Sequence, residues 1–212
     1  MRVYRKKVFV LKAHLKRLRK GLRFFGFKIV YSDDQLKNIF DQLLKMNRLR
    51  DARARISIWK EKGAVRLAMM VDGYKPPSKK KYRQGFKVAV SSIPLKKDKP
   101  SYLKSVRDYV HLRRMLYAAN RRGYDETILV NSQQEVREGS RSNIFLVKQG
   151  RLMTPALTSG ALRGITRGLV ILLAQKNKIP CQEKKVKLAD LTSADEAFVT
   201  SSLLEIMPLT KT

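Results

Sequence analysis

The chain has 212 residues, 43% of them apolar and 30% charged, enough to form a sizeable core in one large domain or two small ones. Lys and Arg number 47 against 17 acidic residues, a formal net charge of +30, which predicts attraction to polyanions but no particular fold. A single cysteine, Cys181, excludes an internal disulfide framework and indicates a reducing, cytoplasmic compartment. No apolar run approaches the roughly 18 residues of a membrane span, so we expect no membrane segment and no signal peptide.

The first part of the chain predicts a small α/β lobe over residues 1–94. Hydrophobic periodicity and turn residues give its elements as a strand over 3–10, a helix over 11–25, a helix over about 33–44, and strands over 55–59, 65–71 and 86–93. Ser32 is a typical N-cap, because acidic residues follow it before the apolar positions recur at helical spacing. The lysine-rich stretch 73–85 carries two prolines and is expected to be a loop.

The second part predicts a larger lobe over residues 101–212, after a basic, proline-flanked linker at 95–100. Its expected elements are a helix over 105–122, strands over 127–130, 144–147 and 151–153, a helix over 165–176, and strands over 183–186 and 197–200. Gly164 precedes the apolar helix, where free backbone N–H groups could hold a phosphate, although an ordinary helix start explains the same residues. The whole chain is therefore expected to be an α+β protein of two lobes.

Several ordered segments carry a resemblance that covers nearly the whole chain. They are RVYRKKVFVLKAHLKRL (2–18), KSVRDY (104–109), RRGYDE (121–126), EGSRSNIF (138–145), LMTP (152–155), LRGITR (162–167) and ADEAFVTSSLLEIMP (194–208), and the match is most specific from 104 to 208. Together they resemble the class IV aminotransferases, the fold-type-IV family of pyridoxal-phosphate enzymes. This family includes branched-chain and D-amino-acid aminotransferases and aminodeoxychorismate lyase. The resemblance implies a two-lobed fold, a pyridoxal 5'-phosphate cofactor, amino-acid and 2-oxo-acid substrates, and a homodimer.

The resemblance also implies a role for particular residues. Lys104 would bind the cofactor covalently and then carry the proton between the substrate Cα and the cofactor. Glu138 would pair with the pyridine nitrogen, and Tyr109 would donate to the cofactor phenolate. The expected contacts to the phosphate and the ring face are Arg17, Leu162, Gly164, Ile165, Thr166 and Ser202. Arg55 is the only candidate for the substrate carboxylate, and no metal is expected, because two histidines and one cysteine do not form a metal site.

Three functions remain open from the sequence. The spacing of Lys104 and Tyr109 resembles branched-chain aminotransferases, whereas TSSLLEIMPL (200–209) resembles aminodeoxychorismate lyase. A third possibility is a basic relative that has lost turnover and binds nucleic acid non-specifically through its charge. Family members usually carry another strand before RVY (2–4) and more chain after residue 208, so we expect the usual ends to be lacking and turnover to be slow. Arg163 stands where the family commonly has proline, which adds a positive charge beside the expected phosphate site.

Overall fold

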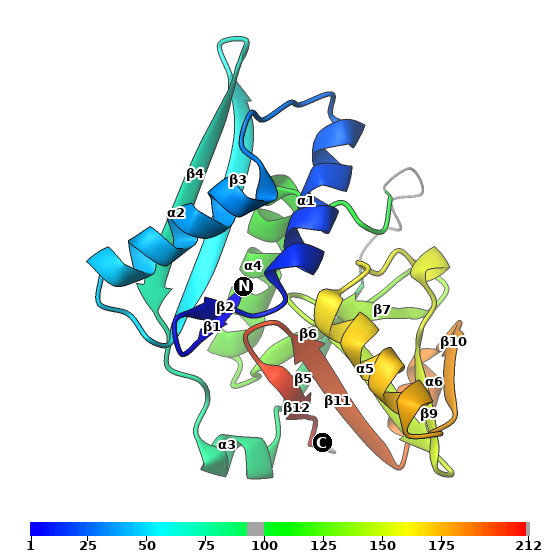
Figure 1. The fold of residues 1–212 in the computed structure, drawn as a ribbon. Coiled ribbons are helices and arrows are strands. Elements are labelled where there is room, and N and C mark those ends of the chain that lie inside the picture. Colours follow the sequence, from blue (N-terminus) through cyan, green and yellow to red (C-terminus); the bar gives the residue numbers. More distant parts are fainter. Residues whose placement is uncertain (93–99, 211–212) are drawn as a thin grey trace. The chain divides into compact units, whose positions relative to one another are not determined.

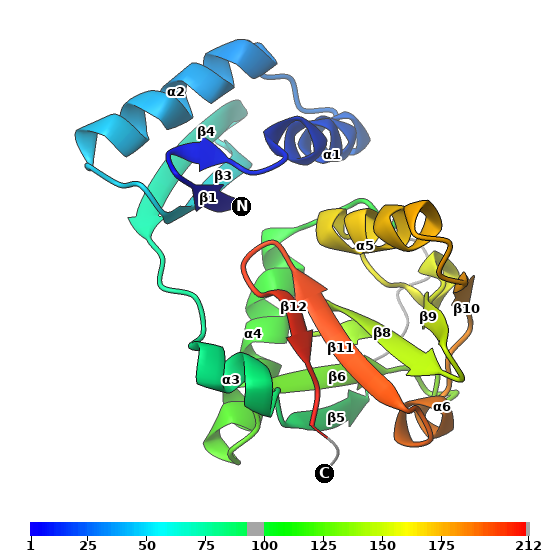
Figure 2. The ribbon, with the colours of Figure 1, turned by 60° about the horizontal axis from the view of Figure 1, so that its bottom comes forward.

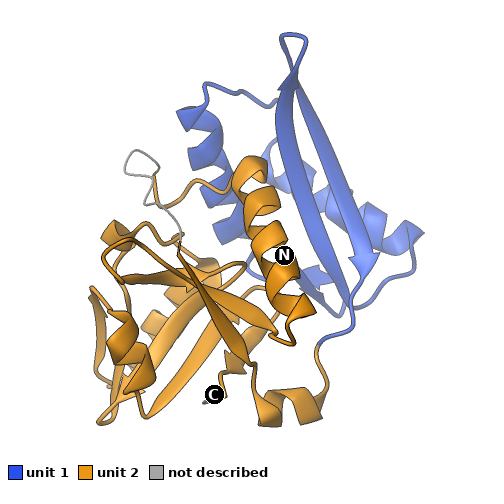
Figure 3. Cartoon of the chain, turned by 180° about the vertical axis from the view of Figure 1, so that it is seen from behind, with its two compact units in different colours: residues 1–76 blue, residues 77–212 orange. Residues whose placement is uncertain are grey.

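The computed structural model describes residues 1–92 and 100–210, and the chain divides into two compact units, Met1–Pro76 and Pro77–Thr212 (Figure 3). Both units combine helices with strands, so the expected α+β class is confirmed. The lobe boundary at 94–101 stays a prediction, since residues 93–99 lie outside the described residues. No helix of the described residues is long and apolar enough to span a membrane.

Unit 1 is one antiparallel sheet with two helices. Its elements are β1 (Arg2–Tyr4), β2 (Lys7–Val8), α1 (Leu11–Phe24), α2 (Asp33–Met46), β3 (Ala52–Glu61) and β4 (Ala64–Gly73), with the strand order β2-β1-β3-β4 (Figure 1). The predicted strand over 3–10 is therefore a hairpin of two short strands, with the expected turn between them. The long β3–β4 hairpin turns at Lys62 and Gly63, both of which have positive φ, as the tightest hairpin turns require.

The second helix begins where Ser32 predicts. The Ser32 hydroxyl accepts the Gln35 backbone N–H at 3.1 Å, and the Gln35 side chain accepts the Ser32 N–H at 2.8 Å. This reciprocal capping satisfies backbone donors that the first turn leaves without partners. One face of α2 then buries Phe40 and Leu44 in the core of unit 1. That face carries the apolar periodicity seen in the sequence, so local capping and core packing favour the same helix.

Unit 2 holds thirteen described elements in two sheets with flanking helices. They are α3 (Lys79–Gln84), β5 (Val88–Ser92), α4 (Val106–Arg121), β6 (Glu126–Val130), β7 (Val136–Gly139), β8 (Asn143–Lys148), β9 (Arg151–Pro155), the 3-10 helix η1 (Leu157–Ser159), α5 (Ile165–Lys176), β10 (Cys181–Lys184), α6 (Leu188–Thr192), β11 (Glu196–Ser201) and β12 (Glu205–Pro208). The five-stranded sheet has the order β10-β9-β8-β11-β12, and the three-stranded sheet has the order β5-β6-β7. Strands β5 and β6 are parallel, and α4 lies in the crossover between them.

The core of unit 2 uses both faces of β8. Ile144 and Leu146 are fully buried in the larger hydrophobic cluster. Phe145 points to the opposite face, as alternation along a strand requires, and stacks on Phe198 with the ring centroids 5.1 Å apart. On that face it packs against Val170 of α5, the helix that covers this side of the sheet (Figure 2). Both faces of β8 are thus covered, which holds the start of the strand, Asn143, in a defined place.

In unit 2, the last described residues are hydrogen-bonded to a residue near the start of the unit. Phe86 donates its N–H to the Pro208 carbonyl at 2.8 Å, and its carbonyl accepts the Thr210 N–H at 3.0 Å. Gly85 has a positive φ of 75°, and a Cβ there would lie 3.0 Å from the Pro208 carbonyl oxygen. Met207 of β12 is fully buried in the larger cluster. The bridge between Phe86 and Leu209 therefore joins the segment before β5 to the segment after β12.

Two expectations were wrong. The stretch 73–85 is not all loop, because α3 forms within it, capped by the Ser78 hydroxyl. Its Tyr82 packs against the larger cluster, and this contact stabilises a helix that the sequence signals only weakly. The strand expected at 183–186 lies at 181–184 instead, where it pairs in parallel with β9. Val186 is buried beyond the end of that strand, so its apolar character reflects core packing rather than strand pairing.

Candidate active site

A buried carboxylate, Glu138 on β7, is the centre of the candidate site. The residue is 6% exposed, and its Oε2 accepts the Leu162 backbone N–H at 2.9 Å and the Asn143 side-chain amide at 3.3 Å. The Nε of Arg137 lies 3.6 Å from its Oε1. A buried carboxylate is costly unless it is hydrogen-bonded and paired. These contacts therefore hold Glu138 in one orientation.

Asn143 ties this carboxylate to the segment before α5. Its amide also donates to the Leu162 carbonyl oxygen at 2.9 Å, so Leu162 is bound through both backbone groups. A Cβ on Gly164 would lie only 1.9 Å from the Asn143 Oδ1, which means that a side chain at this position cannot fit without displacing Asn143. Asn143 lies within the motif EGSRSNIF (138–145), and the sequence pattern alone gives it no role. Its contacts show that it couples Glu138 to the start of the helix.

The N-terminus of α5 follows directly. Gly164 is its N-cap and makes no side-chain capping hydrogen bond, because glycine has no side chain. The first backbone N–H groups of a helix have no acceptor within the helix, so those of Ile165 and Thr166 can bind an anion, favoured by the helix dipole. The hydrogen bonds of Glu138 and Asn143 thus bring four expected residues, Leu162, Gly164, Ile165 and Thr166, into one local structure with Glu138.

The segment that carries Lys104 is anchored on both sides of that residue. Leu103 is buried and donates its N–H to the Pro100 carbonyl at 2.9 Å. Ser105 caps α4, because its hydroxyl accepts the Asp108 N–H at 3.2 Å. Lys104 itself is exposed and lies between the buried anchor and the cap. Its backbone position is therefore defined by its neighbours, while its long side chain remains accessible.

This segment lies against the Glu138 side of the site. Arg163 donates its N–H to the Ser101 carbonyl at 2.6 Å. A small pocket between the two segments is lined by Pro100, Ser101, Leu103, Arg137, Glu138, Gly160, Ala161 and Leu162. The residue before Lys104 and the carboxylate of Glu138 thus line the same pocket. The structure brings the expected lysine segment and the expected carboxylate together.

The remaining expected residues occupy separate elements. Tyr109 is 41% exposed in the first turns of α4, and Ser202 lies in the turn between β11 and β12. Arg17 on α1 and Arg55 on β3 belong to unit 1. Desolvation lowers the pKa of Arg17, yet an arginine remains protonated at neutral pH. Arg55 is exposed, and its Nε donates to the Ser57 hydroxyl at 3.0 Å.

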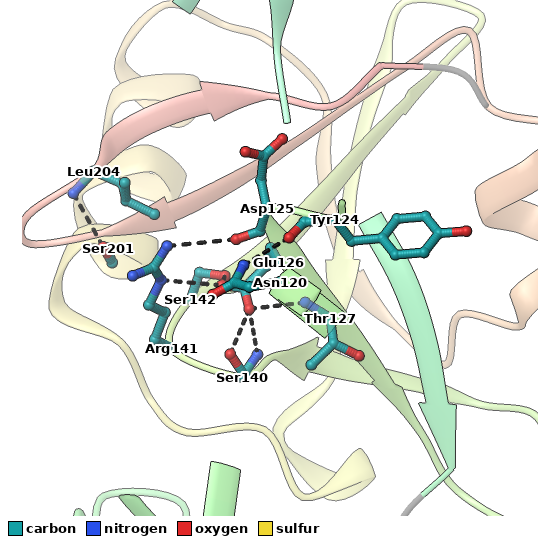
Figure 4. Close-up of polar contacts among 10 residues, drawn as sticks. All are labelled: Asn120, Tyr124, Asp125, Glu126, Thr127, Ser140, Arg141, Ser142, Ser201 and Leu204. Carbon is teal, nitrogen blue, oxygen red and sulfur yellow. Dashed lines mark hydrogen bonds and ion pairs between the residues drawn. The ribbon is translucent and has the colours of Figure 1, made fainter. Parts of the chain in front are cut away.

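A second buried carboxylate supports the turn between β7 and β8. Glu126 is fully buried, and its Oε1 accepts the Thr127 N–H at 2.9 Å, the Ser140 N–H at 3.2 Å and the Ser140 hydroxyl (Figure 4). Its Oε2 accepts the Ser142 hydroxyl at 2.9 Å, and the Arg141 Nε lies 3.8 Å away. The turn leads from Glu138 to Asn143. The only sequence signal for this role is a glutamate at the start of the otherwise uncharged strand ETILV (126–130).

These residues fit pyridoxal phosphate. The buried Glu138 carboxylate suits a protonated ring nitrogen, Leu162 offers an apolar surface, and the amides of Ile165 and Thr166 suit a phosphate. Lys104 would supply the amine that the cofactor aldehyde requires. When bound, the cofactor supplies an electron sink that stabilises negative charge at the substrate Cα. The residues around it would then orient the ring, bind the phosphate and carry a proton.

Fold and candidate site together, a buried carboxylate hydrogen-bonded to the segment before a helix N-terminus, indicate the class of protein to which the chain belongs. The family model described as amino-transferase class IV matches residues 1–212. The chain therefore belongs to the class IV amino-transferase family, and the resemblance read from the sequence motifs is confirmed. An enzyme with this fold was the expectation, and the comparisons bear it out.

Individual relatives agree with this assignment. A putative branched-chain-amino-acid aminotransferase of Methanocaldococcus jannaschii is 31% identical and matches 99% of this chain and 75% of its own length. Aminodeoxychorismate lyase of Bacillus subtilis is 29% identical over the same shares. The crystal structure of the Escherichia coli branched-chain amino acid aminotransferase superposes with a TM-score of 0.90 at 27% identity, and the match covers 98% of this chain and 74% of that one.

Proposed function

We propose that the protein is a pyridoxal-phosphate-dependent transaminase that moves an amino group between an amino acid and a 2-oxo acid, with branched-chain substrates favoured. The observation that carries the proposal is the Glu138 carboxylate, held by Leu162 and Asn143 in the pocket that the Lys104 segment also lines. The branched-chain preference is supported by the M. jannaschii relative.

Each site residue has a defined task in this proposal. Lys104 would hold the cofactor covalently, and its amine would carry the proton at the substrate Cα. Glu138 keeps the ring nitrogen protonated, because a carboxylate stabilises a neighbouring cation. Tyr109 donates to the cofactor phenolate. The phosphate contacts are assigned to Arg17, Ile165, Thr166 and Ser202, with Gly164 allowing close approach and Leu162 packing on the ring. Arg55 is the candidate for the substrate carboxylate.

Covalent trapping tests the site. Borohydride reduction of the purified protein mixed with pyridoxal phosphate should remove the yellow absorbance band and fix one cofactor per chain, and peptide mapping should place it on Lys104. The matched control is Lys148→Ala, a lysine on β8, which should label as the wild type does. An adduct spread over many lysines and unchanged by Lys104→Ala would falsify the assignment.

The second candidate is an aminodeoxychorismate lyase with the same cofactor. It is supported by the B. subtilis relative and by the segment 200–209, which comprises the end of β11, the turn after it and β12. A coupled assay with leucine and 2-oxoglutarate should give turnover above that with aminodeoxychorismate. Formation of 4-aminobenzoate without transamination would instead identify the lyase.

We further propose a cytoplasmic homodimer. Val106, Val110 and Tyr117 are 54%, 45% and 67% exposed, and their spacing places them on one face of α4. Such an apolar stripe supports association despite the high net positive charge. Light scattering at micromolar concentration should give about twice the 24.5 kDa chain mass. A species of single-chain mass would contradict the dimer.

A further inference from the structure

Arg137 and Glu138 form a nearly buried pair of opposite charges in the candidate site. Their side chains are 12% and 8% exposed, and Arg137 Nε lies 3.6 Å from Glu138 Oε1. That separation is too long for a hydrogen bond, and the Nε is buried with no hydrogen-bond partner in the described part of the chain. The Nε and the carboxylate oxygen therefore interact through charge rather than through a hydrogen bond.

Arg137 lies beside only one of the two carboxylate oxygens of Glu138. Glu138 Oε2 accepts the Leu162 N–H and the Asn143 amide, whereas Oε1 is the atom beside Arg137. Arg137 and Glu138 also line the same pocket. A protonated ring nitrogen that pairs with Glu138 would therefore share the carboxylate with a guanidinium that cannot lose its proton. Two cations near one carboxylate repel each other, and partial burial strengthens the repulsion.

We propose that Arg137 is a positioning residue that acts through Glu138 and lowers the basicity of the cofactor ring nitrogen in this site. The inference rests on the proposed function, since it concerns the same cofactor. In this arrangement the guanidinium already neutralises part of the charge of the carboxylate, so the hold of the carboxylate on a second cation is weakened. The protein thus sets how strongly the ring withdraws electrons by means of a residue that does not contact the reacting atoms.

A pair of cofactors separates this electrostatic effect from a structural one. The wild type, Arg137→Met and Arg137→Lys are titrated with pyridoxal phosphate and with its 1-deaza analogue, in which carbon replaces the ring nitrogen. Methionine keeps much of the arginine stem but removes the charge, and lysine retains the charge. We expect Arg137→Met to bind pyridoxal phosphate about five- to tenfold more tightly, Arg137→Lys to stay within about twofold of wild type, and neither to change deaza binding by more than about twofold.

A spectroscopic readout and a double variant complete the test. With cofactor labelled with ¹⁵N in the ring, the ring-nitrogen resonance of the cofactor bound to Arg137→Met should shift toward the chemical shift of the protonated ring. The comparison is with wild type at the same pH. In a Glu138→Gln background the ring nitrogen has no carboxylate to keep it protonated. Arg137→Met should then no longer change the affinity or the resonance, because no second cation is present for Arg137 to repel. Circular dichroism of every variant shows that it is folded before its affinity is compared.

Two results would overturn the proposal. An equal change in affinity for both cofactors means that Arg137 only shapes the pocket, and weaker binding of pyridoxal phosphate alone means that it holds Glu138 for the ring instead of competing with it. Failure of the proposed function is a different result. In that case the wild type itself binds neither cofactor, or borohydride reduction does not fix the cofactor to Lys104.

Discussion

The Glu126 carboxylate accepts a hydrogen bond from the Ser142 hydroxyl at 2.9 Å, and a Cβ placed on Gly139 would lie 2.2 Å from that same hydroxyl oxygen. A buried charge on β6 and a glycine on β7 thus hold the turn that precedes Asn143. Since Glu138 and Asn143 lie at the two ends of this turn, the position of the candidate cofactor carboxylate depends on a group that lies outside the pocket.

Glu126→Gln should therefore weaken both the fold and the site. An amide keeps the shape of the side chain but turns one acceptor into a donor opposite a hydroxyl, and the charge-assisted hydrogen bonds are lost. We expect the free energy of unfolding, measured with urea, to fall by about 2–4 kcal/mol. Glu196→Gln, at an exposed glutamate on β11, should change it by less than about 0.5 kcal/mol. Equal stabilities for the two variants would show that the Glu126 charge is dispensable.

Two glycines of the same segment provide a second comparison. Gly164→Ala would place a Cβ 1.9 Å from the Asn143 Oδ1, whereas a Cβ on Gly168 meets nothing within 4 Å. We expect Gly164→Ala to lower the affinity for pyridoxal phosphate at least about tenfold, because Asn143 must move away from Glu138 and Leu162. Gly168→Ala should leave the affinity unchanged and stabilise α5 by up to about 1 kcal/mol. Fluorescence titration and thermal unfolding measure the two effects.

The ionisation of Glu135 should make the free energy of unfolding depend on pH. Its carboxylate accepts a hydrogen bond from the Asn131 side-chain amide at 2.9 Å and pairs with Lys185 at 3.0 Å. Both contacts lower the pKa of Glu135, and the hydrogen bond from Asn131 has the larger effect. A lowered pKa in the folded state contributes stability above the unfolded value of about 4.3, and the contribution is lost as the pH falls below it. The stability difference between wild type and Glu135→Gln should be largest near pH 7 and shrink between about pH 5 and pH 3. A difference that stays constant over this range would contradict the assignment.

The net charge predicts a weak, salt-sensitive association with nucleic acid. With 47 basic and 17 acidic residues, the protein should bind mixed RNA at about 50 mM salt and lose most of that affinity by about 200 mM. Fluorescence anisotropy of a labelled RNA at the two salt concentrations tests this. Binding that persists at the higher salt would instead favour the nucleic-acid-binding function.

The elements with strong local signals could be predicted from the sequence. Helix α5 begins and ends at the expected residues, because Gly164 precedes a segment rich in apolar residues. Strand β7, VREG, carries no such pattern, and its formation depends on pairing with β6 and on the buried contacts of Glu138. Strand β12 is likewise defined by its pairing with β11. Tertiary contacts decide these segments, and single-residue propensities do not reveal such contacts.

The candidate site divides in the same way. Motif order indicated Glu138 and the start of α5, since these residue types have distinct tasks toward a cofactor. Asn143, Arg137 and Glu126 emerged only from the structure. Each acts through one specific atom. Asn143 contacts the Leu162 carbonyl, Arg137 lies beside one oxygen of Glu138, and Glu126 accepts the hydroxyl of a serine. No spacing rule connects residue 126 with residue 142 before the strands are paired.

The pairing of residues near 86 with those near 208 has a consequence for biosynthesis. Phe86 cannot make its hydrogen bonds to Pro208 and Thr210, nor can Met207 enter the core, until those late residues have left the ribosome. Unit 1 has no such dependence on its partner, because its sheet closes within the first 76 residues. We therefore expect unit 1 to be able to fold during translation, while unit 2 waits for nearly its whole sequence with apolar strands exposed. A nascent chain stalled within β11 should accordingly be protease-resistant in unit 1 and sensitive in unit 2.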